Sequence, residues 1–207
     1  KDYLRKRNLS FQSSITELSV VGEFYTFDLS NKRWSPYVFA GLAVFHFNPY
    51  AYDKMNNKVF LKPLSTEGEG LQGYPDSKPY SLTQLAIPFG AGVKYAINDN
   101  ILIGAEVGLR KTFTDYLDDV SSKYADALDL FNAKGQEAVL LSYRGYEVQG
   151  GSPAYPEKGA QRGNPNSKDY YYFTGITISF RLNGKGEGFS FTHRPGKKGY
   201  GCPANPL

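Results

Sequence analysis

Cysteine, methionine, tryptophan and histidine are nearly missing from this 207-residue chain, which has one, one, one and two of them. Cys202 alone cannot form a disulfide framework, and neither histidine has cysteine, histidine or carboxylate neighbours at metal-ligand spacing. We therefore expect no metal site and no cofactor. Long apolar runs are missing too, because glycine, serine, threonine or a charge interrupts every candidate. This excludes an ordinary transmembrane helix.

Signatures of catalysis and of nucleotide binding are also missing. No serine lies in a nucleophile elbow. Gly184, Gly186 and Gly188 form a GxGxG run without a βαβ unit or a Lys-Ser/Thr pair, and we interpret it as a flexible exit from the last strand. The aromatic run from Tyr170 to Phe173 lacks the Lys/Arg cluster of a nucleic-acid platform and suits a membrane interface. We expect no enzyme, no nucleic-acid partner and no small-molecule substrate.

Glycine and aromatic side chains are abundant, at 22 residues and 15% of the chain. This composition suits short strands joined by long loops, and the length requires only one domain. Five segments alternate apolar with small or polar residues at the period of two that is typical of strands. The second of them is apolar on both faces, so its sides are not assigned. The segments are about Ile15 to Phe27, Tyr37 to Phe47, Leu82 to Ile97, Ile101 to Phe113 and Tyr170 to Leu182.

The charges within these segments favour a transmembrane barrel over a soluble sandwich. Six of them share the small and polar face of their strands, and only Lys111, near a strand end, lies on the other face. A cation on the lipid face near mid-bilayer costs roughly 2 to 4 kcal/mol, whereas a charge in the lumen can be paired or hydrated. In a soluble sandwich the same polar faces would lie in solvent. We predict a lumenal polar plug of Glu17, Glu23, Lys94, Glu106, Arg110 and Arg181.

The connections between the segments alternate in length. Short links at Asp28 to Pro36 and Asn98 to Asn100 alternate with long ones at Asn48 to Tyr80 and Asp115 to Asp169. Outer-membrane barrels have short periplasmic turns and long outer loops. By this rule the first and the last segments both run inward.

Because the first and the last of the five strands run in the same direction, an odd number of further strands is needed to close an antiparallel barrel. Three would give the smallest common barrel, which has eight strands. We therefore expect an all-β, antiparallel outer-membrane β-barrel over residues 1–182, with a signal sequence and about three N-terminal strands missing from this chain. Residues 1–8 would lie in or near an outer loop. An eight-stranded barrel is filled by its own side chains and is not a pore.

The second long loop contains a predicted short helix. Apolar residues recur at a near-helical period between Asp115 and Lys134, and five aspartates lie among them. We expect a surface helix with a solvated acidic face, since the spacing is not that of a calcium loop.

Residues 183–207 form a predicted periplasmic tail that carries the excess charge. Five cations and one carboxylate from Arg181 onward leave +4, the formal net charge of the whole chain. Proline and glycine forbid a regular helix here, so the tail is either an extended linker or a segment that docks on a partner. An unpaired Cys202 in an oxidising periplasm would lie buried in such a contact or form a bridge to another chain. The candidate partner-binding residues are Arg194, Lys197, Lys198, Tyr200 and Cys202.

Three stretches resemble the Bacteroidetes outer-membrane barrels related to PorG of the type IX secretion system. They are Leu85 to Tyr124 (LAIPFGAGVKYAINDNILIGAEVGLRKTFTDYLDDVSSKY), Tyr37 to Ala51 (YVFAGLAVFHFNPYA) and Pro63 to Pro75 (PLSTEGEGLQGYP), and their order and combination carry the resemblance. The resemblance implies a non-catalytic anchor that lies in outer-membrane lipid and binds a periplasmic ring made of a lipoprotein and its partner, PorK and PorN. The alternative is a surface barrel whose long outer loops bind an extracellular ligand or partner.

Overall fold

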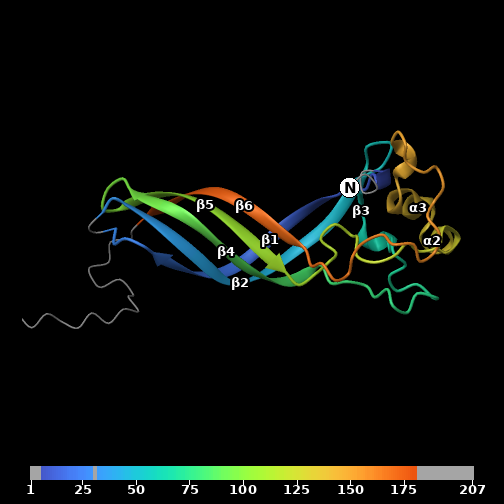
Figure 1. Cartoon of the computed structure of the whole chain (residues 1–207), viewed down its shortest axis with the longest axis horizontal. Helices are drawn as coiled ribbons and strands as arrows, with labels where there is room; N and C mark the ends of the chain where they lie inside the picture. Colours follow the sequence, from blue (N-terminus) through green and yellow to red (C-terminus); the bar gives the residue numbers. More distant parts are fainter. Residues whose placement is uncertain (1–5, 30–31, 181–207) are drawn as a thin grey trace, which may run out of the picture.

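Five long strands form one antiparallel sheet that curls into a half-barrel (Figure 1). The computed structural model describes residues 6–29 and 32–180. Along the sheet the strands are β1 (Gln12–Tyr25), β2 (Trp34–Tyr52), β4 (Thr83–Ala96), β5 (Ile101–Thr112) and β6 (Tyr170–Phe180), and the short β3 (Lys58–Phe60) pairs with β2. The predicted all-β antiparallel architecture is confirmed at this level. Among the described residues, the outer edges of β1 and β6 have no backbone partner.

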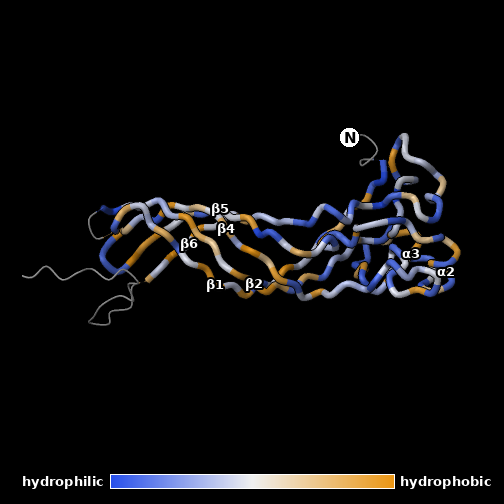
Figure 2. The backbone as a smooth tube through the Cα atoms, turned by 60° about the horizontal axis from the view of Figure 1, so that its bottom comes forward, coloured by the Kyte–Doolittle hydropathy of each residue, from blue (hydrophilic) through white to orange (hydrophobic). Residues whose placement is uncertain are grey.

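Each strand has one face on the concave side of the sheet and one on the convex side. In β2 the odd-numbered Tyr37, Phe39 and Phe45 are buried, while Val38 and Leu42 are exposed, so the structure assigns the two faces that the sequence left open. The convex face is strongly apolar, because most of the large side chains exposed on it are hydrophobic. Hydrophobic stretches recur along the strands (Figure 2). The most exposed large side chains on it include Leu18, Val20, Leu42, Tyr172 and Ile176.

The strand bounds follow the predicted segments closely except in β2. This strand extends past the expected end at Phe47 to Tyr52, because Tyr50, Ala51 and Tyr52 pair with β3 on one side. On the other side Tyr50 pairs with Gln12 of β1. The extension carries the sheet into a lobe built from the long loops.

This loop lobe comprises residues 53–82 and 113–169 and lies at the end of the sheet opposite the short turns (Figure 1). It contains two short helices, α2 (Ala127–Lys134) and α3 (Gln136–Ser142), and the 3-10 turns η1 (Lys62–Leu64) and η2 (Gly145–Glu147). No helix in the described part of the chain is long and apolar enough to cross a membrane. The apolar core of the lobe consists of Leu61, Leu64, Leu130, Ala138 and Leu141, which pack with Ala51 of β2.

The predicted helix over Asp115 to Lys134 is wrong in its extent. The prediction that its acidic face is solvated is also wrong. The helix starts only at Ala127, where the Asp126 side chain accepts hydrogen bonds from two backbone amides of the first turn. Upstream, Asp119 has a left-handed φ of 62°, and the Asp118 carboxylate accepts from the Val120 amide. Such local bonds from aspartate compete with helix formation. Asp119 is fully buried, so this stretch is part of the interior of the lobe.

Candidate functional site

A bidentate ion pair joins β1 and β5 across the concave face. Arg110 of β5 donates from Nε and Nη2 to the two carboxylate oxygens of Glu17 in β1, at 2.9 and 3.0 Å. The Tyr171 hydroxyl of β6 donates to Glu17 at 2.7 Å, and the Arg110 guanidinium lies 3.7 Å from the centroid of the Phe173 ring. Planar bidentate pairs of this kind fix geometry strongly. Side chains therefore link β1 to β6, although their backbones do not pair.

A second polar cluster lies nearer the short turns. Lys94 of β4 donates to Glu23 at 2.6 Å and to the Tyr25 hydroxyl at 2.7 Å, and Tyr37 donates to Glu106 at 2.5 Å. Five of the six side chains assigned to the polar plug thus lie on one concave face, in two clusters. The sixth, Arg181, lies outside the described residues.

Aromatic rings fill the space between these clusters because glycine leaves room for them. A Cβ on Gly108 would come within 2.5 Å of the Phe173 ring and 2.8 Å of the Phe39 ring, and one on Gly90 would come within 2.6 Å of Phe39. The concave face is therefore closed by side chains. The carboxylates of Glu17, Glu23 and Glu106 on this face are all hydrogen-bonded, whereas the buried Thr177 hydroxyl has no partner within the described chain.

A buried carboxylate and guanidinium hold the two long loops together inside the lobe. Arg162 and Glu67 have side chains that are 2% and 0% exposed, and Arg162 Nη1 donates to Glu67 at 3.1 Å. Arg162 also donates to the backbone carbonyls of Asp119, at 2.6 Å, and Ser142, at 3.3 Å. Glu67 in turn accepts from the amides of Ser121 and Ser122 and from the Ser122 hydroxyl. Every oxygen of this buried carboxylate has partners, as burial of a charge requires.

Asp119 extends this network toward the sheet. Its two carboxylate oxygens accept from the Thr66 and Tyr80 hydroxyls, each at 2.6 Å. Burial raises the pKa of Asp119, against the lowering effect of Arg162. The Tyr80 ring stacks on Phe47 of β2 and on Tyr116, with ring centroids 6.2 and 4.5 Å apart. The network is thereby fixed to the end of the sheet.

Two further carboxyl groups of the lobe have pKa values near neutral. Burial, with repulsion from Asp119, raises the pKa of Glu69 to about 7, and one of its oxygens has no hydrogen-bond partner within the described chain. Burial, with repulsion from Asp169, raises the pKa of Asp118 to about 7. No three metal-binding side chains gather anywhere in the described ranges.

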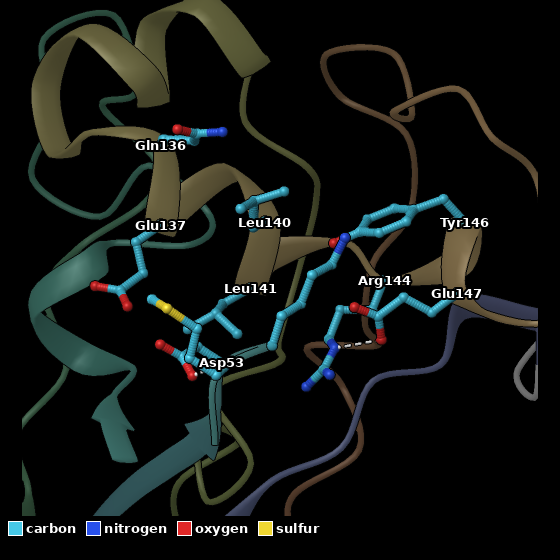
Figure 3. Close-up of a pocket in the computed structure, with 10 residues that line it drawn as sticks. Asp53, Gln136, Glu137, Leu140, Leu141, Arg144, Tyr146 and Glu147 are labelled. Carbon is cyan, nitrogen blue, oxygen red and sulfur yellow. Dashed lines mark hydrogen bonds and ion pairs between the residues drawn. The ribbon is translucent and has the colours of Figure 1, made fainter. Parts of the chain in front are cut away.

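A pocket of about 300 Å³ opens on the surface of the lobe, between the tip of the β2–β3 hairpin, α3 and η2. Figure 3 shows Glu137 and Leu140 on α3 on one side of the pocket, with Arg144 and Tyr146 on the other. Arg144 donates to Glu147 at 2.9 Å and to the Tyr52 carbonyl at 3.0 Å, which fixes this wall to the end of β2.

The candidate tail residues Arg194, Lys197, Lys198, Tyr200 and Cys202 lie outside the described residues. Arg162 and Glu67 are not among the site residues that the sequence predicts. These two residues are 95 positions apart, and no periodicity connects them. The only available signal was the TEGEG run, Thr66 to Gly70, in which a carboxylate lies between residues that favour turns.

The sheet and lobe define a half-barrel protein with a filled concave face, an apolar convex face and an ordered cap at one end. The chain belongs to the family described as a domain of unknown function, DUF6089, whose model matches residues 2–133. That match includes β1 to β5 and the Glu67 side of the buried network. No curated protein and no solved structure matches the chain.

Proposed function

We propose that the chain is most of an outer-membrane β-barrel whose convex face lies in lipid. The distribution of charge carries the proposal. Among the residues of the five long strands, Lys111 is the one Asp, Glu, Lys or Arg on the convex face, whereas Glu17, Glu23, Lys94, Glu106 and Arg110 contact partners on the concave face. An exposed apolar surface of this extent requires a nonaqueous neighbour or a partner.

The dimensions of the apolar band support a bilayer as that neighbour. In β5 the convex residues are apolar from Ile101 to Leu109, close to the 9 to 11 residues with which a tilted strand crosses a bilayer. Exposed Trp34, Tyr95 and Phe180 lie at the turn end of the band, and Lys111 with Tyr170 at its loop end. Aromatic girdles of this kind flank the lipid-facing band of outer-membrane barrels.

The open edges imply how the barrel closes. β1 and β6 run in the same direction, since each neighbouring pair between them is antiparallel. Unpaired backbone groups in lipid cost several kcal/mol each, so an odd number of further strands must pair with both edges. Three would give eight strands, whose interior is filled by side chains, as the concave face is here.

We propose that this barrel serves as a non-catalytic anchor for the periplasmic ring of a type IX secretion system, formed by a lipoprotein and its partner like PorK and PorN. The resemblance of Tyr37 to Ala51 and Leu85 to Tyr124 to that family supports this role. So does the asymmetry of the molecule, because β6 ends at Phe180 at the end of the sheet with the short turns, and the basic residues 183–207 follow it in the sequence.

Deleting residues 189–207 tests the anchor. The deletion should leave the barrel inserted but reduce co-purification of the ring lipoprotein. Changing Arg194, Lys197 and Lys198 to Ala should also weaken binding of the ring, and this binding should be weakest at high salt, where screening removes the remaining attraction. Changing Lys123, Lys134 and Lys158 of the lobe to Ala is the matched control with the same charge loss at the other end. Undiminished ring recovery from the deletion would assign the contact to the turns, and recovery of no ring from the intact chain would refute the role.

A second function is favoured by the lobe. Its long loops are held in one conformation by the buried Glu67–Arg162 network and present a formed pocket, which suits the capture of an extracellular ligand. Ring recovery and ligand binding separate these two functions, because they involve opposite ends of the molecule.

A further inference from the structure

The pocket on the lobe has apolar walls of a size that fits a small molecule. Leu140 and Leu141 of α3 line one side, and Tyr146 lies on the other (Figure 3). Met55, at the exposed tip of the β2–β3 hairpin, completes the walls. A volume of about 300 Å³ lies at the lower end of the range for ligand sites. Such sites combine an apolar lining with a few polar groups that orient the ligand.

Most of the charged groups around this pocket are already occupied. Asp53 accepts from the amides of Met55 and Asn57, at 2.8 and 2.7 Å. Arg144 and Glu147 pair with each other at 2.9 Å. None of these three groups has to find a partner in a ligand.

Two opposite charges remain, one on each side. The Lys54 ammonium lies 4.6 Å from the centroid of the Tyr146 ring and has no carboxylate partner among the described residues. Glu137, in the first turn of α3, forms no hydrogen bond or ion pair with the described part of the chain. In Figure 3 Glu137 and Tyr146 lie on opposite sides of the pocket. A ligand between them meets a cation, an anion and an apolar wall.

We propose that this pocket binds a small zwitterion with an apolar side chain, namely a free amino acid or dipeptide of aliphatic or aromatic residues. The ligand carboxylate pairs with Lys54, its ammonium group pairs with Glu137, and its side chain packs on Leu140 and Met55. The inference deepens the second function, capture of an extracellular ligand by the lobe, and is independent of the ring anchor.

Equilibrium dialysis of the detergent-solubilised full chain against radiolabelled leucyl-leucine tests the site. A ligand of this size should bind with a Kd of about 0.1 to 1 mM, given the modest binding energy per atom of small ligands. Lys54→Gln and Glu137→Gln should each weaken binding about threefold or more, and Leu140→Trp, which fills the pocket, should abolish it. Lys134→Gln, an exposed lysine at the end of α2, is the matched charge control and should bind normally.

Modified ligands identify which group meets which charge. Glu137→Gln should not weaken binding of the N-acetylated dipeptide further, and Lys54→Gln should not weaken binding of the dipeptide amide further. These two comparisons do not use Leu140→Trp, so they still test the site if that variant fails to fold. Absence of saturable binding below about 10 mM, or binding that Lys54→Gln and Glu137→Gln leave unchanged, would overturn the proposal. Vesicle insertion, measured separately, decides the membrane assignment, so a chain that inserts but does not bind refutes the pocket alone.

Discussion

Replacing Arg162 by alanine removes the only cation that contacts the buried Glu67 carboxylate in the described structure. The guanidinium makes three hydrogen bonds, to Glu67 and to the carbonyls of Asp119 and Ser142. Without it, Glu67 keeps its bonds from the amides of Ser121 and Ser122 but remains a fully buried, uncompensated charge. Breaking a buried pair in this way costs about 3 to 5 kcal/mol.

The loss should appear as local opening of the lobe. Hydrogen exchange at the Ser121 and Ser122 amides, followed by mass spectrometry, measures the free energy of that opening. Since about 1.4 kcal/mol corresponds to tenfold, Arg162→Ala should accelerate exchange by about a hundredfold to a few thousandfold. If the uncompensated charge is the cause, removing both charges in Glu67→Gln with Arg162→Met should restore part of the protection.

Lys158→Ala provides the matched control, because it breaks an ion pair with Asp129 in the same lobe whose side chains are 51% and 49% exposed. An exposed pair contributes about 0 to 1 kcal/mol, so this variant should accelerate exchange at most about fivefold. An Arg162→Ala rate within about fivefold of the Lys158→Ala rate would refute the reasoning that the buried pair holds the loops together.

Two further predictions concern charge placement. The pKa of Glu69 is raised from 4.5 to about 7, which means that the folded lobe favours the protonated carboxyl group. The stability that this form contributes to the lobe is fully present below pH 4.5 and is lost as pH rises through 7. Glu69→Gln, which mimics that form, should protect the lobe at pH 8 better than wild type in exchange corrected for intrinsic rates; equal protection of both proteins at pH 8 would contradict this. Val107→Arg, on the convex face of β5, should destabilise the vesicle-inserted chain by about 2 to 4 kcal/mol in urea titration. Its control is Gly175→Arg, a concave site with open space opposite Glu106, and equal midpoints for the two variants would contradict a lipid-facing surface.

The strands were predictable because a sheet with two different environments imposes a local rule. In β5, Ile103 and Val107 face outward while Gly104, Glu106 and Gly108 face the concave side, and a reader of the sequence needs only the period of two to separate them. The faces of β2 could not be assigned in this way, because its concave residues Phe39 and Phe45 are as apolar as its convex ones. Its burial is set by aromatic packing on β6, which no local pattern contains.

The helix in the second loop shows where periodicity misleads. Tyr116, Val120 and Tyr124 recur at nearly helical spacing, but their burial comes from packing in the lobe and not from one face of a helix. Asp118 and Asp126 bind nearby backbone amides, one preventing a helix and the other starting one. Hydrophobic spacing alone does not distinguish these two uses of aspartate.

The lobe depends on contacts between distant segments that meet at the end of β2. Phe47 there packs with Tyr80 and Leu117, and Ala51, four residues on, packs with the lobe core around Leu130. Tyr80 stacks on Phe47 and donates to Asp119, so the same ring contacts the sheet and the buried charges. Because the β2 extension is paired on both sides, by β1 and by β3, it gives the loops a fixed backbone to pack on. The order of the lobe therefore derives from the sheet, even though its residues follow no strand pattern, and a pocket on it can keep its shape without a ligand.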